Sequence, residues 1–140
     1  MEKKYKLLTD DTISSCGRTL YRIEALRDFA DVKAGDKGGY IEKEDNLSHV
    51  GRCWVSHYAF VYDNAKVYGS ARVYGYAEVY GNARVYDTAK VCGKAEVCGR
   101  ASVFDNACVF GSAEVSGSAW VCGTAVICDN AKVFEGLIKE

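Results

Sequence analysis

The stretch AFVYDN-AKVYGS-ARVYGY-AEVYGN, from Ala59 to Asn82, states one six-residue pattern four times without a gap. The pattern continues to Gly136, and Ala occupies its first position in all thirteen copies. The third position is Val in twelve copies and Ile127 in the other. A unit this short cannot bury a core until its neighbours cover it. The period therefore predicts a stacked β-solenoid, because the apolar stripe of an amphipathic helix recurs about every 3.6 residues instead.

Residues two apart in a strand point to the same side, so we expect the Ala and Val of each hexad to face inward. Position five is Gly in eight copies, Asp in four and Glu135 in the last, as a corner with left-handed backbone requires. Three hexads per coil place residue i beside residue i+18, about 4.8 Å away. With the looser unit Cys53–Tyr58, the repeats predict an all-β triangular tube of about four to five coils.

The first part of the chain has a different pattern, and we predict an N-terminal cap over residues 1–46 and a β-helix over residues 47–140. Tyr5–Leu8 and Leu20–Leu26 are typical of the two strands of a β-hairpin, separated by the polar stretch Thr9–Arg18. A cap is needed because an open coil exposes apolar interior and unpaired strand edges. The apolar residues that we expect to plug the opposite end are Phe134, Leu137 and Ile138.

The composition excludes several classes of partner. Eighteen basic and nineteen acidic residues give a formal net charge of -1, which disfavours nucleic acid and anionic membranes as partners. The chain has neither a long apolar run nor a signal segment, so we expect a cytoplasmic protein. No two of its seven cysteines are separated by 18 residues, and none forms a C-x-x-C pair. We therefore expect free thiols and neither a metal nor a cofactor.

The segments around the start of the repeats resemble the N-terminal signature of the YdcK-like hexapeptide-repeat proteins of bacteria and phages. The matching segments are Asp28–Gly35, Gly38–Ile41, Asn46–Ser48, Gly51 and Cys53–Val55. The resemblance implies a left-handed parallel β-helix, a hand that the period alone does not specify. It implies a fold without catalytic residues, and similarity to other left-handed β-helices implies a homotrimer.

Acyl-CoA-dependent hexapeptide-repeat acyltransferases are the alternative function. They use a catalytic histidine, for which His57 is the weak candidate, the other histidine being His49. His57 occupies a corner position that is elsewhere Gly, Asp or Glu, which favours a role in the turn. No insertion between the hexads provides a lid over a site.

The sequence instead favours a non-enzymatic, self-associating binding or structural module, such as a phage-borne inhibitor of a host factor or a protein that sequesters a ligand. Steps of 18 residues place acidic side chains in one column and aromatic side chains in another. Like charges in a column repel unless a partner surface compensates them, and exposed rings form contact surfaces. The candidate contact residues are Glu78, Glu96, Glu114, Tyr68, Tyr86 and Phe104.

Overall fold

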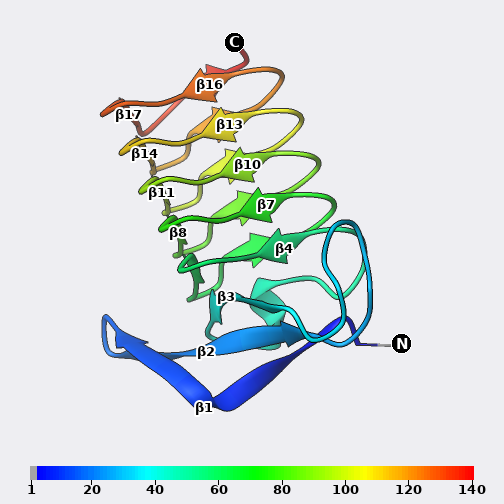
Figure 1. Ribbon diagram of the computed structural model, residues 1–140. Helices are drawn as coiled ribbons and strands as arrows, with labels where there is room; N and C mark the ends of the chain where they lie inside the picture. The colour runs from blue at the N-terminus through cyan, green and yellow to red at the C-terminus, as the bar shows by residue number, and fades with distance from the viewer. Residues whose placement is uncertain (1–2) are drawn as a thin grey trace.

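Three parallel β-sheets wrap around one axis to form a triangular prism, in a computed structural model that describes residues 3–140 (Figure 1). The first sheet, which we call the acidic face, contains β3 (Lys37–Ile41), β5 (Phe60–Val61), β8 (Glu78–Val79), β11 (Glu96–Val97), β14 (Glu114–Val115) and β17 (Lys132–Val133). The second, the groove face, contains β4 (Trp54–Val55), β7 (Arg72–Val73), β10 (Lys90–Val91), β13 (Cys108–Val109) and β16 (Val126–Ile127). The third, the basic face, contains β6 (Lys66–Val67), β9 (Arg84–Val85), β12 (Ser102–Val103), β15 (Trp120–Val121) and β18 (Leu137–Ile138).

Strand pairing confirms the 18-residue step. Glu96 lies beside Glu78 on one side and Glu114 on the other, and Lys90 lies beside Arg72 and Cys108. The ladder is continuous between coils: the Arg72 N–H, for example, donates to the carbonyl of Ala89 at 3.0 Å. The acidic face has one rung more than the hexads predict, because Tyr40 of β3 pairs in parallel with Phe60 before the repeats begin.

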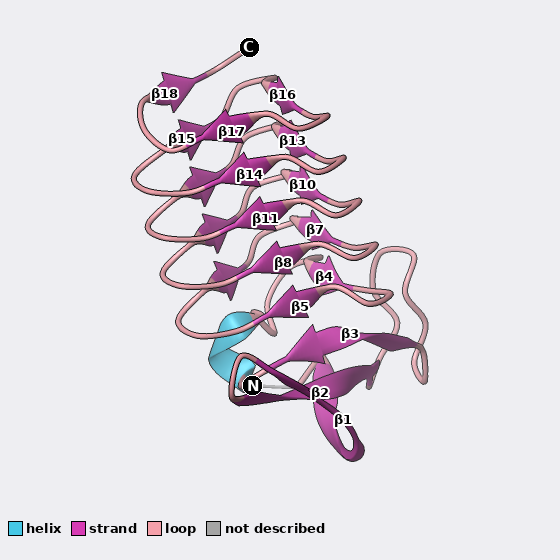
Figure 2. Ribbon diagram, turned by 90° about the vertical axis from the view of Figure 1, so that its left-hand side faces the viewer, coloured by secondary structure: helices cyan, strands magenta, loops and turns pink. Residues whose placement is uncertain are grey.

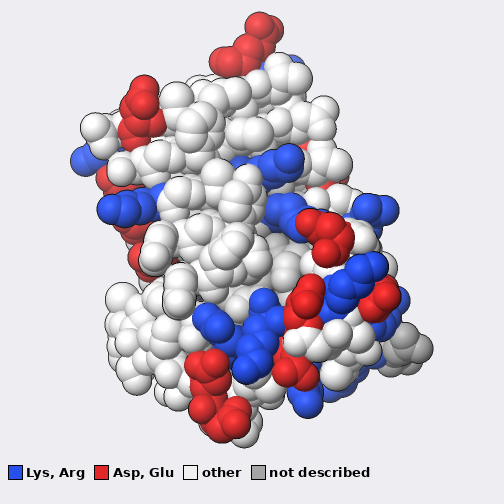
Figure 3. Space-filling model, in the orientation of Figure 1, with Lys and Arg blue, Asp and Glu red and all other residues white. Residues whose placement is uncertain are grey.

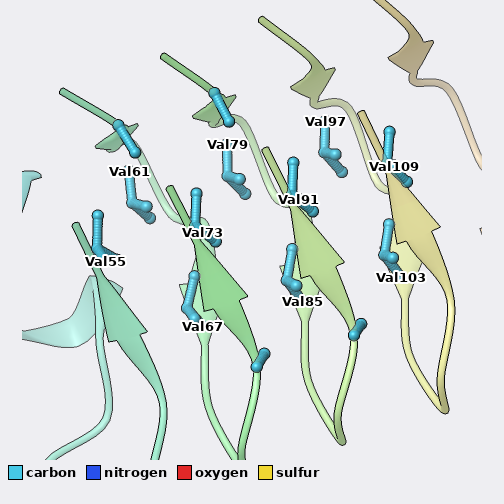
Figure 4. Packing of buried hydrophobic residues seen from close by; sticks show 14 of the residues in the cluster. Val55, Val61, Val67, Val73, Val79, Val85, Val91, Val97, Val103 and Val109 are labelled. Atoms are coloured by element: carbon cyan, nitrogen blue, oxygen red, sulfur yellow. The ribbon is translucent and has the colours of Figure 1, made fainter. Parts of the chain in front are cut away.

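The interior is built from the first and third positions of the hexads, as predicted. Val61 through Val121 along the stack are at most 1 % exposed, and the alanines from Ala59 to Ala125 are fully buried. Figure 4 shows the valines of successive coils following one another in rows, such as Val73, Val91 and Val109. Ala leaves space for the narrow tube while Val fills its corners, so every coil adds the same small section of core.

The corners explain the alternation of Gly and Asp at position five. Gly75 has φ +70, and a Cβ there would lie 3.0 Å from the backbone nitrogen of Gly93 in the next coil. Asp87 adopts the same conformation, with φ +58, and its Oδ2 accepts the Asp105 N–H at 3.1 Å. Asp is therefore tolerated where its carboxylate also bonds to the following coil.

The solenoid is left-handed, as the resemblance implied. Figure 1 shows the groove face at the front and the acidic face on the left. Figure 2, seen from that left side, shows the groove face on the right and the basic face, with β15 and β18, on the left, which is the back of the molecule in Figure 1. With the C-terminus uppermost, the chain thus runs from the front to the left to the back while it rises. Seen from the C-terminal end this path is clockwise and approaches the viewer, which defines a left-handed coil.

The hairpin covers the N-terminal end, but its strands are longer than the sequence predicts. β1 (Tyr5–Ser15) pairs antiparallel with β2 (Arg18–Ala25), and β2 pairs with β3. The prediction of a polar connection over Thr9–Arg18 is wrong: most of it is strand, interrupted by an irregularity between Leu8 and Thr12. The side chains of β1 beyond Tyr5 are half-buried or exposed, so the strand carries little apolar signal.

A short 3-10 helix, η1 (Glu44–Asn46), leads from β3 into the next face. Asn46 is fully buried and satisfies its amide completely. Its Oδ1 accepts the N–H groups of Glu42 and Lys43, and its Nδ2 donates to the carbonyls of Asp63 and Ala65 at 3.2 and 2.9 Å. This side chain therefore connects the cap to the first two hexads.

The prediction that Phe134, Leu137 and Ile138 plug the C-terminal end of the tube is wrong. Phe134 is 62 % exposed and Leu137 is 54 % exposed. β18 adds another rung instead, with Leu137 beside Trp120 and Ile138 beside Val121. The alternation of the strand directs Leu137 outward, so these residues continue the wall of the tube. No helix within residues 3–140 is long and apolar enough to cross a membrane.

Candidate functional site

Three glutamates form a column along the acidic face. Glu78, Glu96 and Glu114 lie side by side in register, and carboxylates about 4.8 Å apart repel one another. Burial, together with the charge of Glu96, raises the pKa of Glu78 above its usual value. Lys132 Nζ lies 3.6 Å from Glu114, whereas Glu78 and Glu96 form no ion pair within the part of the chain that the structure describes. The column is thus a strip of largely uncompensated negative charge.

Tyrosines border this column on both sides. On one side the Tyr62 hydroxyl donates to Glu78 at 3.3 Å and the Tyr80 hydroxyl to Glu96 at 2.9 Å. Burial is the main cause that raises the pKa of both phenols, so they remain donors at neutral pH. On the other side, Tyr58 and Tyr76 stack with centroids 5.6 Å apart and are 53 % and 61 % exposed. Sequence reasoning missed this second pair, although Tyr at the sixth position of a hexad departs from the usual Asn, Ser or Thr.

The other predicted contact residues lie elsewhere on the prism. Tyr86 stacks on Tyr68 and on Phe104, with centroids 4.8 and 5.0 Å apart. This column follows β6, β9 and β12 and forms the edge between the basic face and the groove face. Within one copy, the structure therefore does not bring the aromatic column together with the acidic column.

The aromatic column borders a patch of cations on the basic face. Lys66 and Arg84 lie in register and are exposed. Arg84, Arg100, Tyr86 and Trp120 line a shallow hollow of about 480 Å³. Neither Lys66 nor Arg84 forms an ion pair with another described residue, so this patch carries unpaired positive charge.

The groove face carries the third surface feature, an open groove of about 550 Å³. The loop after β2 rises beside β4 and β7 and forms its rim (Figures 1 and 2). Asp31 of this loop accepts a bond from Arg72 Nη2 at 2.6 Å, and that contact holds the pKa of Asp31 below its usual value. In Figure 3, basic and acidic atoms meet on the side of this face where the loop lies.

His57 also lines this groove, but its surroundings are those of a turn residue. It has φ +59, like the corner glycines, and its Nδ1 is 3.4 Å from Ser56 Oγ. A general base is normally oriented by a third group. The carboxylate that shares the groove, Asp31, bonds to Arg72 instead.

His49 belongs to the cap. Its Nδ1 accepts the Lys4 N–H at 3.1 Å, so its Nε2 carries the proton and donates to Glu44 at 2.8 Å. Its ring stacks on Tyr5 with centroids 4.1 Å apart.

Cysteines and other ligating residues do not gather into a centre. All seven cysteines are free. Within residues 3–140, no group of three or more His, Cys, Asp or Glu side chains could hold a metal ion.

One family model matches the chain, that of the YdcK beta solenoid repeat, over residues 59–75. The chain is a YdcK-like β-solenoid repeat protein. The match falls on the first three hexads, where the corner and core positions are already regular. No curated protein matches the chain.

Proposed function

We propose that this YdcK-like protein is a non-enzymatic binding module that assembles with copies of itself, the acidic face of one copy against the basic face of the next. The observation that carries the proposal is the presence of two surfaces of opposite and largely uncompensated charge on neighbouring faces: the glutamate column, and Lys66 with Arg84. Opposite charges across an interface favour encounter and fix its register.

The shape of the prism is suited to a closed ring. The acidic and basic faces share one edge, formed by the corners that contain Tyr62 and Tyr80. When that edge points to a common axis, each copy presents its acidic face to one neighbour and its basic face to the other. Such a contact between unlike surfaces closes into a ring when the rotation permits. The number of three copies that we propose comes from the similarity to other left-handed β-helices and not from the angle between the two faces.

The two sets of candidate contact residues would then be halves of one interface. Glu78, Glu96 and Glu114 supply the acidic half, while Tyr68, Tyr86 and Phe104 flank the cationic half. Stacked rings add apolar contact area beside the charges. We place this assembly in the cytoplasm, because seven free cysteines fit a reducing compartment.

Charge exchange tests the proposal. The triple variant Glu78→Lys, Glu96→Lys, Glu114→Lys should sediment as a monomer, because both faces are then basic. Adding Lys66→Glu and Arg84→Glu to that variant makes the two faces complementary in charge again, with their signs exchanged, and should restore the assembly.

The control reverses two cations outside the interface, Arg72→Glu and Lys90→Glu on the groove face, and should leave the mass unchanged. The proposal is wrong if the fully exchanged variant stays monomeric, or if the groove-face control dissociates the assembly equally.

A further inference from the structure

The groove on the groove face combines cations and hydroxyl groups from separate parts of the chain. Arg72 and Lys90 come from the adjacent strands β7 and β10 and form its floor. The remaining lining residues are Asp31, Ser56, His57, Ser70, Tyr74 and Thr88, which come from the rim loop and from the corners on both sides of the strands. The volume of about 550 Å³ is that of a site for a small molecule.

The two cations lie where they repel each other. Arg72 and Lys90 are directly opposed in the parallel ladder, with backbones about 4.8 Å apart. Asp31 compensates one charge through a single bond to Arg72 Nη2, and a guanidinium has five N–H donors. Lys90 forms no ion pair among residues 3–140. Three charged groups therefore leave the groove with one formal positive charge.

Neutral donors surround these charges. Ser56, Ser70 and Tyr74 each carry a hydroxyl on the wall of the groove. A hydrogen bond with Cys92, with burial as the next cause, raises the pKa of Tyr74 to about 12, so its phenol keeps its proton at neutral pH. The Thr88 hydroxyl is already engaged, since it donates to the carbonyl of Asp105 at 2.8 Å.

We propose that this groove binds a phosphate group, either a small phosphate monoester or inorganic phosphate, between Arg72 and Lys90. A dianion matches two stacked cations better than a carboxylate does, and its oxygens can accept from the hydroxyl of Ser70 on the wall. A phosphate alone occupies only part of the groove, which leaves room for the small organic part of an ester. The groove lies outside the interface proposed above, so the two proposals stand or fall separately.

Isothermal titration calorimetry with glucose 6-phosphate and with inorganic phosphate, at constant ionic strength, tests this inference. We expect binding with a millimolar or lower Kd, weakened about tenfold or more by Arg72→Gln with Lys90→Gln. The control is Lys6→Gln with Lys139→Gln, which removes two exposed cations outside both the groove and the proposed interface and should leave Kd unchanged.

A substitution of Asp31 should change the affinity in the opposite direction. Asp31→Asn removes the carboxylate that competes for Arg72, so the ligand should bind more tightly than it does to Glu140→Gln, which changes the net charge equally. Equal Kd values for the two ligands would identify inorganic phosphate as sufficient, and a tighter Kd for the ester would identify the monoester. Absence of heat at millimolar ligand, or equal weakening by both double variants, would overturn the inference.

Discussion

Ala95 illustrates how little space each residue of the interior has. It is fully buried, in a tube whose walls are formed by the neighbouring Val side chains and by the coils on both sides. Replacement of Ala95 by Leu should lower the free energy of unfolding by about 1–3 kcal/mol, because the added methylenes overpack the core. Chemical denaturation measures this effect.

The chain contains its own control for this substitution. Ala131 has the same place in its hexad but is exposed at the C-terminal end. Ala131→Leu should therefore change the stability by less than about 0.5 kcal/mol. Equal effects of the two substitutions would contradict the inward placement of the first position.

Gly93 tests the corners in the same way. It has φ +66, and an added Cβ would lie 2.8 Å from the backbone nitrogen of Gly111. Gly93→Ala combines backbone strain with a clash and should cost more than about 2 kcal/mol, which the melting transition will show. At Gly136, with φ +91, an added Cβ meets nothing within 4 Å, so Gly136→Ala should cost only the backbone strain. Equal melting temperatures of the two variants would show that contact between the coils is not the reason for glycine at these corners.

At the scale of the elements, the acidic face carries an electrostatic cost that depends on pH. The folded-state pKa of Glu78 lies above its unfolded value, because burial and Glu96 disfavour the carboxylate. The folded state therefore holds this proton more tightly, and its stability falls as the pH rises from the unfolded pKa through the folded pKa.

Glu78→Gln should thus stabilise the monomer at pH 7, by less than about 1 kcal/mol, and should lose this advantage near pH 4. Thermal melts of both proteins at a concentration where neither associates will check this. An advantage that is the same at both values of pH would show that repulsion in the column is not its cause.

The elements also show which features could be predicted from the sequence. The columns follow from the fixed period, because every hexad is identical in length and residue i therefore lies beside residues i−18 and i+18. The hairpin could be predicted from the sequence, but the full length of β1 could not. This strand faces mostly solvent and has no apolar alternation beyond its first residues. The groove could not be predicted from the sequence, because its rim depends on the contact between Asp31 and Arg72, which are 41 residues apart in the chain.

At the scale of the whole molecule, the tube is thin and its outer surface is large. Each coil buries small residues, so the core is modest for a chain of 140 residues. The 18-residue step already places the acidic column on a face and the aromatic column on a corner, and the structure shows that this corner lies between the basic face and the groove face. The proposed assembly would use the two columns as opposite halves of one interface.

Sedimentation equilibrium of the unmodified protein at tens of micromolar tests the self-association most directly. We expect three times the 15.3 kDa of the single chain, and a decrease toward the mass of one chain as added salt screens the facing charges. A mass of one chain at low salt would contradict the account and would leave the acidic and basic faces to a different partner.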